Sequence, residues 1–132
     1  MAGYTVRNLR EVENQGVRLG MNENDIQLRM AKDPLECTHT GITYIKLGPG
    51  WRTPFGHTHK TQEEIYVLVS GSARMKIGDD EVVELKPFTA VRVSPETMRA
   101  YEGGPKGAEL IVIGAPKTGP GDADNVAGWW SD

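Results

Sequence analysis

Short apolar segments separated by turn residues run through most of this chain, and this pattern most constrains its fold. The segment 73–77, ARMKI, places Ala73, Met75 and Ile77 on one face and two basic residues on the other, as expected for a strand with one buried face. Turn signals recur about every 8–12 residues, a spacing typical of sandwiches and barrels. No amphipathic stretch of about ten residues or longer predicts a helix. The chain is therefore predicted to be all-β, with strands at 4–9, 26–31, 41–47, 64–69, 73–77, 81–85, 91–94, 98–102 and 109–113.

The size and charge of the chain predict one acidic domain. Its 132 residues carry 15 Lys and Arg against 18 Asp and Glu, a formal net charge of −3, which argues against nucleic acid as a partner. We expect a single domain over 1–132, with a barrel core at 41–114, N-terminal strands and a loop at 1–40, and a covering tail at 115–132. No targeting signal or membrane span is evident, so the expected location is the cytoplasm, with Cys37 reduced.

Two histidines and a glutamate form the clearest candidate site. His57 and His59 are two residues apart, and side chains at i and i+2 of a strand point to the same face. Glu64 follows after a short turn that would bring its carboxylate beside both rings. Two imidazoles and one carboxylate are typical of metal sites that keep coordination positions open for substrate. The other nearby pair of potential ligands, Cys37 and His39, is interpreted as incidental.

The stretch 50–71, GWRTPFGHTHKTQEEIYVLVSG, resembles the first motif of the cupin superfamily, G(X)5HXH(X)3–4E(X)6G. His57, His59, Glu64 and Gly71 fit this motif in register, whereas Gly50 lies one residue too far from His57. The resemblance extends over about residues 41–114 and is closest to unassigned bacterial cupins. It implies a single cupin-type antiparallel β-barrel, also called a jelly roll, with a site in the barrel mouth. It also implies that the three polar residues bind a divalent Fe, Mn, Ni, Zn or Cu ion.

The second cupin motif, G(X)5PXG(X)2H(X)3N, is degenerate in this chain. It aligns with residues 88–103, where Arg99 stands at the position of the remaining histidine ligand. A guanidinium has no lone pair to offer a metal. Arg99 therefore has three interpretations: it neutralises Glu64 in place of a metal, it binds an anionic substrate, or it points outward to the surface. Strand parity with Tyr101 favours an inward side chain.

Further residues are predicted to contact a ligand or to cover the site. Gln62, Tyr66 and Tyr101 are candidates for ligand binding together with Arg99. Which of Glu63 and Glu64 faces the site stays open, because a one-residue slip reverses the faces of a strand.

Aromatic residues near the site and at the end of the chain have separate expected roles. Trp51 and Phe55 flank the histidine loop, where they either form a lip over the pocket or pack on the barrel rim. Trp129 and Trp130 are expected to dock the tail onto the barrel or onto a neighbouring subunit.

The residues leave three functions open. The first is a small-molecule-binding cupin, whose ligand could be anionic. The second is a metal-dependent dioxygenase, isomerase, decarboxylase or lyase. The third is a metal-free structural or regulatory barrel. The resemblance implies a homodimer, which is also expected because a small all-β chain exposes sheet edges.

Overall fold

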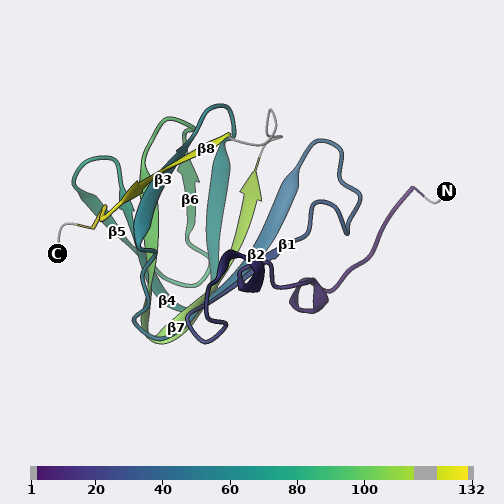
Figure 1. Ribbon diagram of the computed structural model, residues 1–132, viewed down its shortest axis with the longest axis horizontal. Helices are drawn as coiled ribbons and strands as arrows, with labels where there is room; N and C mark the ends of the chain where they lie inside the picture. The colour runs from purple at the N-terminus through teal and green to yellow at the C-terminus, as the bar shows by residue number, and fades with distance from the viewer. Residues whose placement is uncertain (1–2, 115–121, 131–132) are drawn as a thin grey trace.

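The computed structural model describes residues 3–114 and 122–130, and within them it confirms the all-β prediction. Its strands form one antiparallel sheet that curls into a barrel (Figure 1). The elements are η1 (Leu9–Glu11), η2 (Val17–Leu19), β1 (Ile26–Met30), β2 (Gly41–Leu47), β3 (Phe55–His59), β4 (Glu64–Ile77), β5 (Glu81–Leu85), β6 (Ala90–Val93), β7 (Arg99–Gly114) and β8 (Ala123–Ala127).

Two long bent strands, β4 and β7, organise the barrel. They pair with each other over nearly their whole length, and the pairing shifts at bulges between Leu68 and Ser70 and between Gly71 and Ala73. The sequence predicts a turn at Gly71, but the chain continues as one strand. Gly71 has a φ of 79°, and a Cβ there would lie 2.2 Å from the carbonyl oxygen of Gly107. The glycine therefore permits a close, kinked crossing of two strands instead of a reversal.

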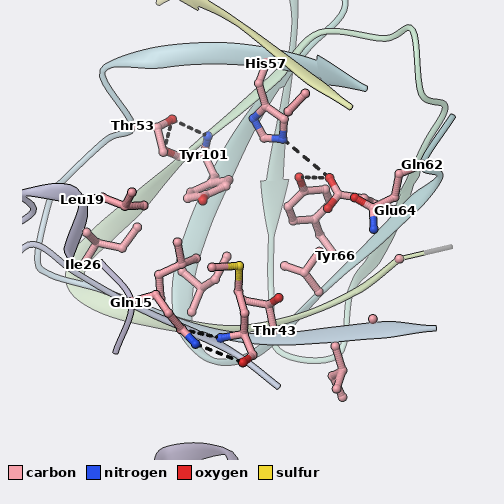
Figure 2. A pocket seen from close by; sticks show the side chains of 18 of the residues that line it. Gln15, Leu19, Ile26, Thr43, Thr53, His57, Gln62, Glu64, Tyr66 and Tyr101 are labelled. Atoms are coloured by element: carbon pink, nitrogen blue, oxygen red, sulfur yellow. Dashed lines mark hydrogen bonds and ion pairs between the residues drawn. The ribbon is translucent and has the colours of Figure 1, made fainter. Parts of the chain in front are cut away.

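Alternation along the strands fills the barrel with apolar side chains. Leu68, Met75 and Leu110 are completely buried, and each contributes about 1.5–3 kcal/mol through burial. Tyr66 and Tyr101 belong to the same core cluster, but they lie beside the polar end of the barrel interior (Figure 2). The core therefore grades into the candidate site.

The predicted N-terminal strand at 4–9 is wrong. Residues 4–8 form no regular element and Leu9–Glu11 is a 3-10 turn, which the side chain of Asn8 caps by accepting from Arg10 N. Tyr4 and Val6 are 78% and 74% exposed, so this segment has neither a partner strand nor a buried face. The predicted strand at 26–31 is present as β1.

The N-terminal segment is held to the outside of the barrel by Glu109 on β7. This carboxylate accepts hydrogen bonds from Tyr44, from Ser70 at 2.7 Å and from Arg10 at 2.8 Å. Hydrogen bonding from Tyr44, Ser70 and Arg10 lowers the pKa of Glu109 to about 2. No helix in the described part of the chain has the length and apolar character needed to cross a membrane.

Candidate metal centre

Strand β3 carries both histidines into the barrel mouth. It lies between β7 and β8 in the sheet, and His57 is directly opposite Arg99 of β7. His57 and His59 point to the same side because they are two residues apart on one strand. Their rings meet edge to face, with centroids 5.1 Å apart.

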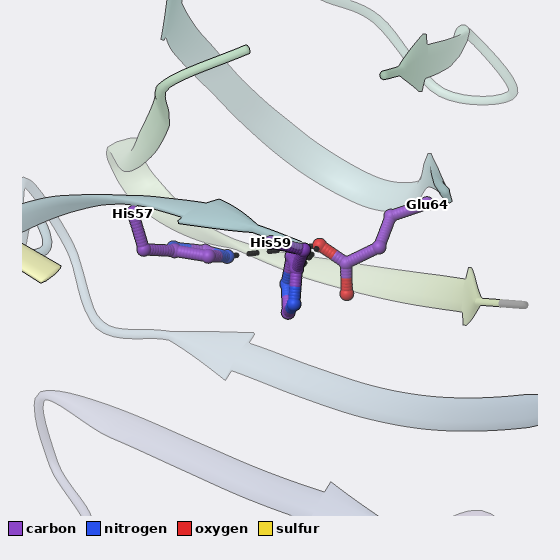
Figure 3. Close-up of side chains that lie close together, drawn as sticks. All are labelled: His57, His59 and Glu64. Atoms are coloured by element: carbon purple, nitrogen blue, oxygen red, sulfur yellow. Dashed lines mark ion pairs between the residues drawn. The ribbon is translucent and has the colours of Figure 1, made fainter. Parts of the chain in front are cut away.

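Glu64, the first residue of β4, completes the cluster shown in Figure 3. Its Oε1 lies 3.6 Å from Nε2 of His57 and 3.2 Å from Nε2 of His59. Glu63 is exposed and pairs instead with Arg92 at 3.3 Å. The structure thus answers which of the two glutamates faces the site.

The environment of the cluster favours a charged carboxylate and a neutral imidazole. Burial by itself would raise the pKa of Glu64, but interactions with both histidines and a 2.7 Å hydrogen bond from Tyr66 lower that pKa well below its usual range. Burial lowers the pKa of His57, and Glu64 offsets this only in part. A neutral imidazole and an ionised carboxylate are the forms that bind a metal ion.

His59 has a second carboxylate partner that the sequence did not reveal. Its Nδ1 lies 2.9 Å from Oδ2 of Asp122, which immediately precedes β8 and is only 3% exposed. Thr61 donates to the other oxygen through its backbone N–H at 3.1 Å and its hydroxyl at 2.8 Å. Burial alone would raise the pKa of Asp122, but the contacts with Thr61 and His59 lower it to about 2.

The donor atoms of the cluster fit a metal ion. Ligands about 2.0–2.2 Å from one ion lie about 2.8–3.6 Å from each other at right or tetrahedral angles. The two distances from Glu64 fall in this range, and the three donor atoms lie within 4.8 Å of one another. Nε2 of His59 is buried and has no hydrogen-bond partner among the described residues. It faces a carboxylate oxygen, so a proton or a cation is needed between them.

Arg99 is fully buried, as strand parity predicts, but it does not line the cavity. Its Nη2 donates to the carbonyl oxygen of Ser94 at 2.8 Å, and its Nη1 lies 4.0 Å from Oε1 of Glu64. This is one long contact with the carboxylate, not a two-pronged pair. Arg99 therefore supplies a fixed positive charge beside the cluster.

A cavity of about 600 Å³ opens in front of the cluster. Figure 2 shows His57, Glu64 and Tyr66 at one end and Gln15, Leu19 and Ile26 at the other. The cavity is also lined by Gln62, Tyr101, Trp51 and Phe55, and by Met30 and Lys32 from the N-terminal region.

The two tyrosines in the wall of the cavity remain protonated donors. Burial is the main cause that raises the pKa of both Tyr66 and Tyr101, and Glu64 raises it further. Tyr66 uses its hydroxyl proton to hold Glu64.

The other residues singled out from the sequence lie apart from the cluster. Cys37 is half-buried and His39 exposed, and neither lines the cavity. Trp130 donates from Nε1 to the carbonyl oxygen of Thr53 at 3.0 Å, and Lys76 donates to the carbonyl oxygen of Trp129 at 2.7 Å. The described part of the tail is thus docked on its own barrel.

The fold is that of the cupins. No family model matches the chain, and no curated protein matches it. A cupin protein from Bacteroides fragilis, BF4112, is 23% identical over 91% of this chain and 89% of its own, with a TM-score of 0.69. KdgF from Halomonas sp. is 18% identical over 89% of this chain and 96% of its own, with a TM-score of 0.67. A variant of Streptomyces PAC13 with uridine is 18% identical over 96% of this chain and 93% of its own, with a TM-score of 0.71.

These likenesses confirm at the level of the fold what the sequence motif implies. The chain has the cupin fold, and such neighbours include enzymes as well as proteins of unassigned activity. Pac13, for example, is a nucleoside dehydratase.

Proposed function

We propose that this chain is a small-molecule-binding cupin that holds a divalent transition metal ion with His57, His59 and Glu64. The observation that carries the proposal is the buried Nε2 of His59, which faces a carboxylate oxygen at 3.2 Å without a hydrogen-bond partner among the described residues. A bound ion would satisfy both atoms and would act as a Lewis acid at its open coordination positions. Fe, Mn, Ni, Zn and Cu all suit this set of donors.

The cavity supports a ligand that has both apolar and hydrogen-bonding groups. Trp51 and Phe55 offer aromatic surface, while Gln62 and the hydroxyl of Tyr101 are placed to bind polar atoms. Glu64 and Asp122 carry two negative charges and Arg99 carries one positive charge. A divalent ion therefore leaves the site with a net positive charge, which favours an anionic group on the ligand.

A metal-dependent enzyme is the second candidate, and the buried phenol of Tyr101 favours it. Tyr101 keeps its proton well above neutral pH, so it can donate a hydrogen bond to an oxygen that gains negative charge during a reaction, whereas the proton of Tyr66 is already donated to Glu64. Dioxygenation, isomerisation, decarboxylation and elimination by a lyase are all open to such a site.

Metal content tests the proposal directly. Protein purified without an affinity tag is analysed for its elements, then incubated in turn with Fe²⁺, Mn²⁺, Ni²⁺, Zn²⁺ and Cu²⁺ and analysed again. We expect about one ion per chain, lost in Glu64→Gln and retained in Glu63→Gln, because only Glu64 faces the cluster. Failure of every ion to bind would refute the metal site and favour a metal-free barrel.

We further propose that residues 1–132 act as one domain that forms a homodimer. Ile42 of β2, Ile113 of β7 and Ile65 of β4 are paired side by side on the outer face of the sheet, and Ile113 is 39% exposed. The largely exposed Tyr4 and Val6 lie on the N-terminal segment, which would cover this face of a second copy. Light scattering should give the mass of a dimer that Ile113→Lys converts to a monomer. A monomer at all concentrations would contradict this.

A further inference from the structure

We propose that Asp122 is a positioning residue that fixes the tautomer and orientation of His59, an inference that rests on the proposed metal site. Asp122 does not touch the cavity. It acts through its 2.9 Å contact with Nδ1 of His59, on the side of the ring opposite to Glu64. Carboxylates that orient a ligating histidine in this way typically raise metal affinity about 10- to 100-fold.

The hydrogen bonds leave the histidine one neutral tautomer. An ionised carboxylate can only accept, and both ring nitrogens of His59 face one. Only Nδ1 is hydrogen-bonded, to Asp122, whereas Nε2 has no hydrogen-bond partner among the described residues, so the proton of the neutral ring is expected on Nδ1. The carboxylate itself is held in place, because the backbone N–H and the hydroxyl of Thr61 both donate to its other oxygen. Nε2 therefore keeps its lone pair and points it at Glu64, where a metal ion would bind.

The end of the chain holds Asp122 in position. Strand β8 begins at the next residue, and its Ala123 is paired with His59 of the neighbouring strand β3. The backbone N–H of Lys60 donates to the carbonyl oxygen of Asp122 at 2.8 Å. Further along, Trp129 and Trp130 are docked on the barrel, with the amine of Lys76 4.1 Å from the centroid of the Trp129 ring. The candidate site thus includes a segment far from the metal ligands in the sequence.

Replacing Asp122 by Asn changes the tautomer with almost no change in shape. The backbone N–H of Thr61 can only donate, so the oxygen of the new amide stays opposite Thr61 and its NH₂ group faces His59. An NH₂ group donates, so Nδ1 must accept and the ring proton moves to Nε2. This removes the lone pair that would bind the metal.

Metal titration tests whether Asp122 positions His59 for metal binding. The affinities of the unmodified protein, Asp122→Asn and Asp124→Asn for Zn²⁺ and Mn²⁺ are measured in competition with a chromophoric chelator. Asp124 is the matched control, because it lies only two residues further on, in β8, loses the same charge and is exposed. We expect Asp122→Asn to bind about 10- to 100-fold more weakly and Asp124→Asn to bind as the unmodified protein does. Equal affinities of Asp122→Asn and the unmodified protein would overturn the inference.

Heteronuclear NMR of the histidine side chains gives a second readout that needs no metal and no variant. In metal-free protein, under conditions where the rings are neutral, His59 should carry its proton on Nδ1. A proton on Nε2 would overturn the inference even if Asp122→Asn failed to fold. If no ion binds while the Nδ1 proton is observed, the proposed metal function fails but the positioning of His59 by Asp122 stands.

Discussion

The buried contact between Arg99 and Glu64 should contribute strongly to stability in the metal-free protein. Arg99→Met keeps most of the side chain's volume but removes its charge and its hydrogen bond to Ser94. It leaves the carboxylate of Glu64 without its nearby guanidinium. Breaking a buried pair in this way typically costs about 3–5 kcal/mol of unfolding free energy. We therefore expect Arg99→Met to be destabilised by a similar amount.

The pairwise part of this cost follows from distance and burial. The closest charged atoms of Arg99 and Glu64 are 4.0 Å apart. At this distance their Coulomb attraction is about 4 kcal/mol at an effective dielectric constant of about 20 and about 1 kcal/mol in water. Arg99 is fully buried and the Glu64 side chain is 13% exposed, so we expect a coupling energy of about 2–4 kcal/mol.

A double-mutant cycle measures this coupling. Urea unfolding is compared for the unmodified protein, Arg99→Met, Glu64→Gln and the double variant, all in the presence of a chelator. The exposed pair of Arg92 and Glu63 is the control, because its 3.3 Å separation is shorter but its side chains are 61% and 51% exposed. It should couple by less than about 1 kcal/mol. If the buried pair couples no more strongly than this exposed pair, the reasoning from burial is wrong.

Three further predictions concern other parts of the structure. Gly56→Ala would place a Cβ 2.5 Å from Cγ of Trp129 and should lower the free energy of unfolding in urea by about 1–3 kcal/mol. Gly41→Ala has open space around its Cβ and should leave that free energy unchanged. Equal stabilities of the two variants would contradict the docking of the tail. The pKa of Glu109 is about 2 when folded, against an ordinary 4.5, so its stabilisation is present above pH 4.5 and is lost as the pH falls toward 2. Glu109→Gln should remove about 1–2 kcal/mol of that pH dependence, and an unchanged profile of unfolding free energy against pH would count against it. Arg99→His should raise metal affinity about tenfold or more in a chelator titration, because it replaces a cation by an imidazole; an unchanged affinity would mean that this position does not reach the metal.

Local patterns in the sequence predicted β1, β2, β5 and β6 and separate parts of β4 and β7, but not β3 or β8. The alternation in 41–47 and 81–85 predicted β2 and β5 with the bounds that the structure shows. It failed where geometry depends on a distant segment. Gly71 resembles the end of a strand, yet β4 continues through it because Gly107 crosses closely there. Residues 4–9 have strand-like composition but find no partner strand.

The sequence by itself determined which side chains share a face. Spacing by two residues places His57 with His59, and Glu64 with Tyr66, because successive side chains of a strand alternate. Only the tertiary structure decided how these faces meet. It brings Glu64 within 3.6 Å of both histidines and Arg99 within 4.0 Å of Glu64. It also brings Asp122 to His59, which is 63 positions away in the sequence. The physical reason is that alternation is a local property of the backbone. Contacts between strands depend instead on the closure of the whole barrel, which no short segment encodes.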